Sequence, residues 1–211
     1  MSPNESMTKI YLYKRFERFW HWVQALLVII LIVTGFEIHG AWRLFGFEEA
    51  VEIHGWCGWA WIILYAFIIF WLFTTGEWKQ YIPTTKKLLS MVGYYSLGIF
   101  KGDPHPMPKS ERIKHNPLQR LTYLGIASVI IPLQMITGAL YYNYNHWISW
   151  DWRALTLGSM AFIHTAGAFA IFIFLIVHVY MTTTGHGVSA HIKAMITGWE
   201  EVPETETPAS E

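Results

Sequence analysis

The sequence predicts an all-α membrane protein, a four-transmembrane-helix bundle with both termini in the cytoplasm. Its composition predicts this class, because hydrophobic residues make up 53% of the 211 residues and charged residues only 14%, whereas a soluble domain carries about 25% charged residues. Four stretches also lack Asp, Glu, Lys and Arg, and each is suited to supply the roughly 20 residues of a spanning helix. These stretches are residues 19–36, 53–76, 121–150 and 154–192.

The last two stretches are longer than a membrane span, so we place the third span near residues 119–142 and the fourth near residues 156–183. The first stretch does not read as a cleaved signal, because no small-residue cleavage site follows it. The sequence there is Thr34-Gly35-Phe36-Glu37-Ile38-His39. All four stretches are therefore expected to remain as spans.

Lys and Arg residues fall mostly on one side of these spans. Of the 15, 13 lie in the N-terminal arm, in the connection between spans two and three, or after the last span. Only Arg43 and Arg153 lie on the other side. The positive-inside rule therefore places both termini in the cytoplasm. We expect a multi-pass protein of the bacterial inner (cytoplasmic) membrane. The outer side carries acidic residues, namely Glu48, Glu49, Glu52 and Asp151.

The connection between helices two and three, residues 77–117, is expected to form a cytoplasmic interfacial segment. Within it, residues 83–100 are expected to form an amphipathic helix on the membrane surface, and the prolines of residues 101–110 predict irregular structure. Residues 1–199 are expected to form one transmembrane domain. Residues 200–211, which are acidic and contain proline, are expected to form a disordered tail.

Four histidines lie inside or at the edge of the apolar stretches, where an imidazole is costly unless something uses it. They are His21, His54, His164 and His178. If the N-terminus is inside, His21 and His178 lie near the cytoplasmic surface, and His54 and His164 lie near the outer surface. His164 and His178 are 14 residues apart, which places them on nearly one helix face and about 21 Å apart along the axis. The four therefore predict two facing pairs of metal ligands, as needed to carry electrons across a bilayer.

A b-type haem needs two axial ligands on opposed helices and a flat slot between them. Small residues are available to open the outer slot: Gly55, Gly58, Gly167 and Ala168. A covalent c-type haem is not indicated, because the only cysteine is Cys57 and no Cys-x-x-Cys-His occurs. A single histidine in a span is more often a core residue bonded to a carbonyl, but four at two matched depths are harder to explain in that way. Among the other histidines, His115 is the first candidate for a substitute ligand.

Several short motifs follow one another along the chain. They are Arg18-Phe19-Trp20-His21-Trp22, Thr34-Gly35, His54-Gly55, His115-Asn116-Pro117-Leu118-Gln119, and His164 with His178. Thr137-Gly138 also repeats Thr34-Gly35 at a similar place in span three. In this order the motifs resemble the di-haem membrane cytochrome b subunits of nickel–iron hydrogenases, formate dehydrogenases and thiosulfate reductases, from Arg15 to Gly198. The ending, residues 187–198, is most similar to the thiosulfate-reductase-type branch.

The resemblance implies that residues 1–199 hold two haem b groups, with His21, His54, His164 and His178 as axial ligands. It also implies that Asn116 and Gln119 line a pocket for menaquinone or ubiquinone near the cytoplasmic-side haem. Arg15 and Arg18 are candidates to hold a propionate of that haem or to lie beside the quinone. Further candidates for anion contacts are Arg112 and Lys114 inside, and Arg43 and Arg153 outside.

The implied function is electron transfer between the quinone pool and a periplasmic redox subunit of the iron–sulfur or multihaem type, as the quinone-reactive subunit of a respiratory oxidoreductase complex. The outer loops, residues 38–53 and 143–155, are too short for a catalytic domain, so substrate chemistry is expected to belong to the partner. Two alternatives remain open: a free-standing di-haem cytochrome that reduces a diffusible acceptor, and a transporter whose histidines bind a metal or small solute. Nothing indicates a nucleic-acid partner.

Overall fold

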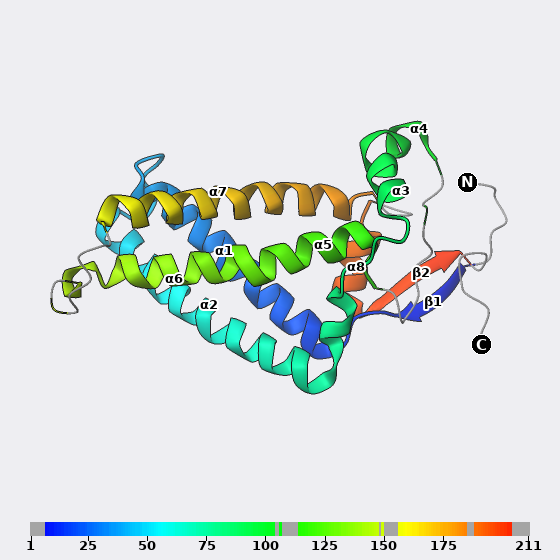
Figure 1. The fold of residues 1–211 in the computed structure, drawn as a ribbon, viewed down its shortest axis with the longest axis horizontal. Helices are drawn as coiled ribbons and strands as arrows, with labels where there is room; N and C mark the ends of the chain where they lie inside the picture. The colour runs from blue at the N-terminus through cyan, green and yellow to red at the C-terminus, as the bar shows by residue number, and fades with distance from the viewer. Residues whose placement is uncertain are drawn as a thin grey trace. The chain divides into compact units, whose positions relative to one another are not determined.

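The computed structural model describes residues 7–103, 106, 114–147, 149, 156–184 and 188–203. Four of its helical segments are long and apolar enough to cross a membrane. They are α1 (Arg15–Ile38), α2 (Phe47–Thr75), a third segment made of α5 (Pro117–Gly125), η3 (Ile126–Ile130) and α6 (Ile131–Tyr142), and α7 (Leu157–Thr182) (Figure 1). The expected four-helix membrane fold is confirmed.

The first two helices begin earlier than the charge-free stretches do. α1 starts at Arg15 and α2 at Phe47, and both have acidic residues in the first turn. A carboxylate there is favourable, because the N-terminal end of a helix carries a partial positive charge and unpaired N–H groups. Counting uncharged residues therefore locates the apolar part of a helix but misses its charged first turn.

The chain forms two compact units. The span unit consists of residues 19–74 and 126–177, and the terminal unit of residues 1–18, 75–125 and 178–211.

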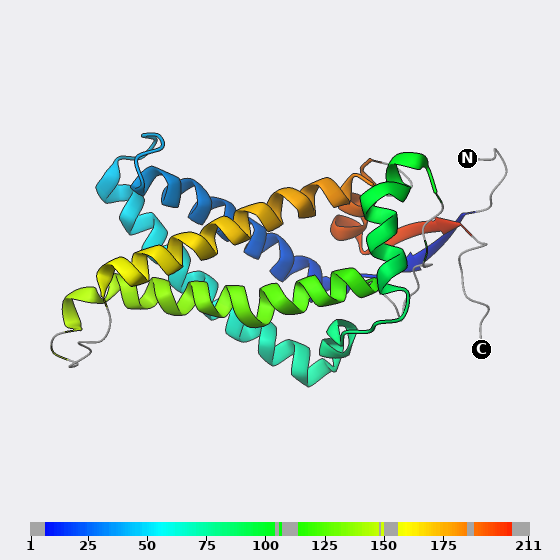
Figure 2. The same ribbon diagram turned by 45° about the horizontal axis from the view of Figure 1, so that its top comes forward.

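The core of the span unit receives side chains from all four helical segments. Its buried centre is formed by Trp61 of α2, Ile131 of α6 and Ile171 of α7, with Leu27 and Leu31 of α1 packed against it. Figure 2 shows the four segments of this unit in a second view. Because each segment contributes to one shared core, their side chains hold the positions of the histidines relative to one another within this unit.

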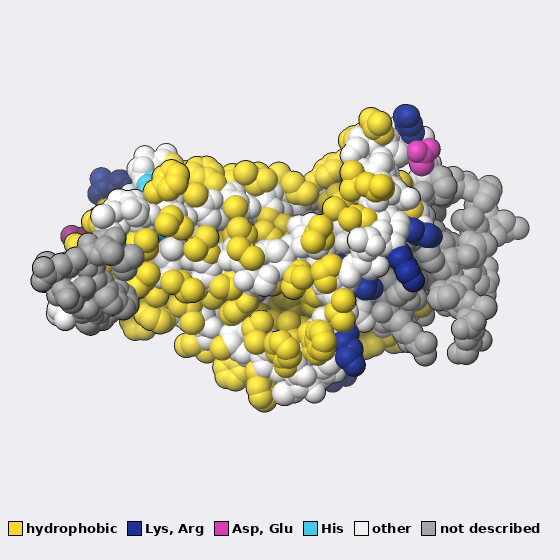
Figure 3. All heavy atoms as spheres, in the orientation of Figure 1, with side chains coloured by type: hydrophobic (Ala, Val, Ile, Leu, Met, Phe, Trp, Pro, Cys, Tyr) yellow, Lys and Arg dark blue, Asp and Glu magenta, His cyan; other side chains and the backbone are white. Residues whose placement is uncertain are grey.

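The outward faces of these helices are apolar. On α2, large exposed side chains recur every three or four residues, at Ile63, Phe67, Phe70 and Phe73, which is the spacing of one helix face. Figure 3 shows hydrophobic side chains spread over the helices on one face of the molecule. Exposed apolar surface of this extent is costly in water and is what a lipid-facing helix needs.

The third segment contains a π-helical turn, η3, which ends two residues before Pro132. Proline lacks the N–H that would bond to a carbonyl of the preceding turn, so carbonyl groups in this turn need other donors. The hydroxyl of Tyr65 on α2 donates a hydrogen bond of 2.6 Å to the carbonyl of Ala127. This bond ties α2 to the irregular turn within the apolar part of two spans.

The terminal unit contains a two-stranded antiparallel sheet formed by β1 (Met7–Tyr11) and β2 (Trp199–Pro203), visible in Figure 1. β2 follows α8 (Ala190–Thr197) through Gly198, whose φ of 92° is a left-handed conformation that glycine adopts without strain. The carbonyl of Gly198 accepts a hydrogen bond from the N–H of Leu12, at 2.9 Å. The turn and the sheet therefore support each other.

This sheet corrects one expectation. Residues 200–203 form part of β2 and are not part of a disordered tail, because β1 supplies backbone partners for them. The remaining tail, residues 204–211, lies outside the described residues.

The connection after α2 is helical in short pieces. It contains η1 (Glu77–Tyr81), α3 (Leu88–Gly93), the π-helical η2 (Tyr94–Gly98) and α4 (Ile99–Lys101). The expected helix over residues 83–100 therefore begins at Leu88, five residues late. Most of residues 101–110, and also Arg112, Asp151 and Arg153, lie outside the described residues.

Candidate metal centre

Two of the four histidines of interest face each other in the span unit. The rings of His54 on α2 and His164 on α7 have their centres 6.3 Å apart, with ring planes at 73°. An imidazole with bonds of about 1.33 Å has its atoms about 1.1 Å from the ring centre, and a metal–nitrogen bond is about 2.0 Å long. Two imidazoles on opposite sides of one metal ion would therefore have ring centres about 6.2 Å apart. The observed distance matches this requirement.

Each of the two histidines contacts a threonine of the preceding span. Thr34 Oγ1 on α1 lies 2.9 Å from Nδ1 of His54, and Thr137 Oγ1 on α6 lies 3.1 Å from Nδ1 of His164. Both threonines are buried. Because Nδ1 is engaged in both rings, Nε2 is the nitrogen through which each histidine would bind a metal.

A glycine follows each threonine and lies against the same imidazole. A Cβ atom at Gly35 would lie 3.5 Å from Cε1 of His54, and one at Gly138 would lie 2.9 Å from Cε1 of His164. The first distance is an ordinary contact and the second is a clash. Each of the two Thr-Gly pairs noted in the sequence therefore packs against one of the two imidazole rings.

The structure adds one polar residue that the sequence analysis did not single out. The Nε2 amide of Gln134, a buried residue on α6, lies 3.1 Å from Nε2 of His164. This amide must move aside before a metal can bond to the same nitrogen. The sequence does contain a signal for it, since Gln134 is the only Gln, Asn or charged residue between Tyr123 and Asn143.

The small residues expected to open the slot have different surroundings. A Cβ at Gly55 would lie 3.2 Å from the ring of Tyr142, whereas one at Gly58 would meet nothing within 4 Å. A Cβ at Gly167 would collide with the side-chain oxygen of Gln134. Gly55 and Gly167 therefore stand where a larger side chain would crowd the surroundings of the histidine pair.

The chemistry of these donors fits a haem. Two neutral imidazoles bind iron strongly from opposite sides, and each has a hydrogen-bonding partner on its second nitrogen, as metal-bound histidines usually do. The spans around the pair are apolar, which suits a largely hydrophobic macrocycle. The donor type and the ring spacing fit a bis-histidine haem, and binding would require the Gln134 amide to leave Nε2 of His164.

His21 and His178, the other predicted pair, belong to different units, so their pairing stays a prediction. His21 belongs to the span unit and His178 to the terminal unit. The ring of His178 contacts that of Tyr123 on α5, with centres 6.4 Å apart.

Tyr123 belongs to a row of aromatic rings in the terminal unit. His115 lies between Tyr81 and Tyr123, with ring centres 5.2 Å from each, and the row continues from Tyr123 to His178. Burial raises the pKa of Tyr81 well above its ordinary value, so its hydroxyl keeps its proton. This row joins His115, the substitute ligand considered above, to a predicted ligand through one tyrosine.

Asn116 and Gln119 form a reciprocal cap at the start of α5. The side-chain oxygen of Asn116 accepts the N–H of Gln119 at 2.9 Å, and the side-chain oxygen of Gln119 accepts the N–H of Asn116 at 3.0 Å. This is a capping-box arrangement with Pro117 in the first helical position. The Asn116 amide also donates to the hydroxyl of Tyr95, at 3.0 Å. The motif thus has a structural role, whatever else it binds.

Charged residues of the terminal unit form a partly buried network. The Lys114 ammonium, 5% exposed in its side chain, lies 2.8 Å from Glu17 and 3.1 Å from Glu77. Lys14 bonds the other oxygen of Glu77, at 2.5 Å. The expected role of Lys114 as an anion-binding residue competes with this network, because its charge is already matched.

Arg15 and Arg18, the candidates for a haem propionate or the quinone side, lie at the start of α1. Arg18 donates from Nη1 to the carbonyl of Ile196 near the C-terminal end of α8, at 2.5 Å, where a cation is favourable. Arg15 is exposed. Arg18 therefore helps to hold α8 within the terminal unit.

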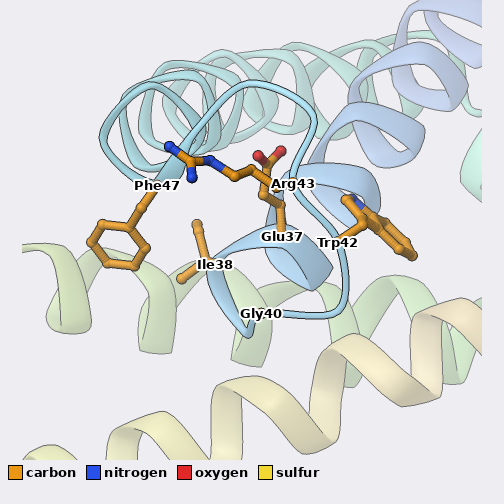
Figure 4. Close-up of a pocket in the computed structure, with 6 residues that line it drawn as sticks. All are labelled: Glu37, Ile38, Gly40, Trp42, Arg43 and Phe47. Carbon is orange, nitrogen blue, oxygen red and sulfur yellow. The ribbon is translucent and has the colours of Figure 1, made fainter.

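The connection between α1 and α2 is fixed by Glu37. One oxygen of its carboxylate accepts hydrogen bonds from the N–H groups of Leu44, Phe45 and Gly46, at 2.7, 2.8 and 2.8 Å. Glu37 and Arg43 line a hollow of about 410 Å³, and their side chains are drawn in Figure 4. The hollow is also lined by Ile38, Gly40, Trp42 and Phe47. This clamp sets the point at which α2, the helix that carries His54, begins.

Comparison with known proteins finds similar sequences over most of this chain. A family model described as prokaryotic cytochrome b561 matches residues 12–198. The cytochrome YdhU of Escherichia coli K12 is 27% identical over 94% of this chain and 77% of its own length. A Ni/Fe-hydrogenase B-type cytochrome subunit of Cupriavidus necator is 27% identical over 94% of this chain and 90% of its own. One of Rhodobacter capsulatus is 28% identical over 90% and 81%.

Proposed function

Because this chain belongs to the prokaryotic cytochrome b561 family, we propose that it carries electrons between a membrane quinone and a redox protein on the periplasmic side. Family membership establishes the coarser statement: the chain is a multi-pass bacterial membrane protein and a b-type cytochrome that transfers electrons. The quinone, the partner, the number of haem groups and the orientation in the membrane are the proposal.

The observation that carries the proposal is the facing pair of His54 and His164, with ring centres at the spacing of two axial ligands. We propose that a second haem is bound by His21 and His178. Haem b, when bound, supplies one-electron chemistry. The protein supplies neutral imidazoles, an apolar surround and, through Thr34 and Thr137, a fixed ring orientation.

We place the quinone site in the terminal unit. The row of Tyr81, His115 and Tyr123 offers aromatic surfaces for a flat ring, and both tyrosines carry a hydroxyl group that is a possible donor to a quinone oxygen. Asn116 adds an amide whose two N–H groups are not both used by Tyr95. Menaquinone and ubiquinone share the chemistry that these groups would recognise.

We place the partner on the side of the α1–α2 connection. Two curated relatives are named as cytochrome subunits of Ni/Fe-hydrogenases, which supports a partner that oxidises a substrate outside this chain. Glu48, Glu49 and Glu52 at the start of α2 make that side acidic, so a basic or mixed docking surface fits it. An electron moving inward works against an inside-negative potential by about 2.3 kcal/mol per 100 mV, so electron flow from the partner to an inner quinone would conserve energy.

The test is reduction of the purified cytochrome by a quinol. We expect a soluble menaquinol or ubiquinol analogue to reduce b-type haem in the isolated subunit, and crosslinks from the intact complex to reach residues 38–53. Haem that dithionite reduces but neither quinol reduces would contradict the quinone proposal. Crosslinks to residues 77–117 only would place the partner on the opposite side.

A further inference from the structure

We infer that Thr34 and Thr137 are positioning residues that hold His54 and His164 as the Nδ1–H tautomer and so keep both Nε2 lone pairs directed to the metal. The inference rests on the proposed haem between these two histidines. It assigns a role to the two Thr-Gly pairs, which the family assignment leaves unexplained.

The number of protons on each threonine hydroxyl decides which atom donates in its contact with the imidazole. A threonine hydroxyl has one proton. Thr34 Oγ1 lies 2.8 Å from the carbonyl oxygen of Ile30, and Thr137 Oγ1 lies 2.7 Å from that of Leu133, both one turn earlier in their own helices. A carbonyl can only accept, so each hydroxyl donates there. The lone pairs of the oxygen are then what faces the imidazole, and Nδ1 must carry the proton.

Gln134 gives independent evidence for His164. Its amide nitrogen, 3.1 Å from Nε2 of His164, can only donate a hydrogen bond. With the amide in this orientation, Nε2 of His164 accepts and the proton of this ring is on Nδ1. Two neighbours on opposite edges of the ring thus require the same tautomer.

The surroundings of His54 and His164 repeat one local arrangement. Thr34 and Gly35 on α1 support the ligand on α2, and Thr137 and Gly138, 103 positions later, support the ligand on α7. The same offset relates Leu31 to Gln134, and these two differ. The two arrangements therefore share the hydroxyl and the glycine. The amide that covers the metal-binding nitrogen is present at position 134 and is replaced by leucine at position 31.

The hydrogen bond has a predictable effect on the metal. An acceptor on Nδ1–H makes the imidazole a stronger donor to the metal, and loss of such a partner typically lowers metal affinity about 10- to 100-fold. A stronger donor favours the oxidised, more positively charged iron. Removing the hydroxyl should therefore move the reduction potential of this haem to a more positive value.

The experiment uses the full-length, haem-loaded protein. Thr34→Val and Thr137→Val remove the hydroxyl acceptor at nearly constant volume and leave the backbone of Leu31 beside His54 and that of Gln134 beside His164. Thr34→Ser and Thr137→Ser keep the hydroxyl. Thr74→Val is the matched control, because Thr74 Oγ1 makes the same bond to the carbonyl one turn earlier, at 2.9 Å, in an exposed position of α2. The readouts are the reduction potential of each haem by optical titration, the low-spin electron paramagnetic resonance signal, and haem per chain.

We expect each Val variant to move one haem's potential to a more positive value and to change its resonance signal, or to lose that haem, while the Ser variants and Thr74→Val keep the wild-type values. If a Val variant does not accumulate, Thr→Ala and Thr→Ser at the same position give the same comparison. Val variants with wild-type potentials and signals would overturn the inference, as would Ser variants that behave like Val.

His54→Ala and His164→Ala separate this inference from the proposed function. If each removes one haem while the Val variants change nothing, the haem assignment stands and only the role of the threonines fails. If the alanine variants keep all haem, the proposed ligand pair itself is wrong.

Discussion

Lys114 and Glu17 form a buried ion pair across 97 residues of sequence, in which the ammonium reaches both carboxylate oxygens at 2.8 and 2.9 Å. Both residues are only 7% exposed. Burial of a charge is tolerated when it is paired and hydrogen-bonded, and becomes strongly unfavourable when one partner is removed. The pair thus joins the first turn of α1 to the residues that precede α5.

The Lys114→Met variant should be strongly destabilised, by about 3–5 kcal/mol, because Glu17 would remain buried without its partner. The double variant Glu17→Gln/Lys114→Met should recover a large part of this loss. Thermal or denaturant unfolding in detergent measures both. The control is Lys9→Met, since Lys9 and Glu201 pair at 3.4 Å with side chains 67% and 60% exposed, where little effect is expected. Equal losses in the two single variants would contradict the argument.

Haem content should depend on the histidines in pairs. His54→Ala or His164→Ala should remove one haem and leave the other, and His21→Ala or His178→Ala should do the reverse, because an iron that loses an axial ligand is held weakly. The pyridine-haemochrome assay should fall from two haem groups per chain to one, with different spectra for the two classes of variant. Loss of the same haem in the His54 and His178 variants would disprove this pairing.

Gly138→Ala and Gly35→Ala should have unequal effects. The added methyl group would lie 2.9 Å from His164 at position 138, where the ring or the helix must shift, but 3.5 Å from His54 at position 35, which is an ordinary contact. We expect loss or spectral change of one haem in Gly138→Ala and near-normal spectra in Gly35→Ala. Identical spectra in the two variants would show that Gly138 does not lie closer to His164 than Gly35 lies to His54.

Asn116 can be tested for its two roles separately. Asn116→Ser keeps an acceptor for the cap of α5 but removes the amide donor, whereas Asn116→Leu removes both. If the amide helps to bind quinone, both variants should slow quinone-linked turnover, and only Asn116→Leu should also lower the unfolding temperature. Normal turnover in Asn116→Ser would limit this residue to capping.

The stability of the protein should be nearly constant over a range of pH whose limits are set in part by Glu77 and Lys14. Burial tends to raise the pKa of Glu77, but hydrogen bonds and charges from Lys14 and Lys114 outweigh it and hold the pKa below its usual 4.5. The hydrogen bond to Glu77 raises the pKa of Lys14 above its usual 10.5. The Glu77 contribution is present above about pH 4.5 and is lost as the pH falls through its lower folded pKa.

The Lys14 contribution is present below about pH 10.5 and is lost as the pH rises through its higher folded pKa. The unfolding temperature should therefore be steady between these limits and fall at both ends. Glu77→Gln should reduce the acid-side fall. An unchanged acid limb in that variant would assign the fall to other carboxylates.

The sequence predicts the spans well because lipid imposes one rule on them. A spanning segment must be long, apolar and internally hydrogen-bonded, and the charge-free stretches meet this rule without reference to neighbours. The Thr-Gly repeat was also visible in the sequence. Its purpose was not, because it depends on which helix lies beside α1, and one sequence does not contain that information.

The terminal unit was harder to predict for the same reason. β1 and β2 are five-residue strands that pair across most of the chain, so neither has a local pattern that reveals its partner. The cap formed by Asn116 and Gln119 is different. It follows the capping-box spacing of three residues and could have been recognised beside the resemblance that pointed to a quinone.

The pairing of β1 with β2 has a consequence for how often the chain crosses the bilayer. Residues 7–11 and 199–203 are hydrogen-bonded to each other, so they must lie in the same aqueous compartment. A chain that leaves one compartment and returns to it crosses the membrane an even number of times. The four apolar helices satisfy this parity, and they do so independently of where lysine and arginine lie. Inserting one additional spanning helix between the strands would leave them in opposite compartments, and the sheet could not form.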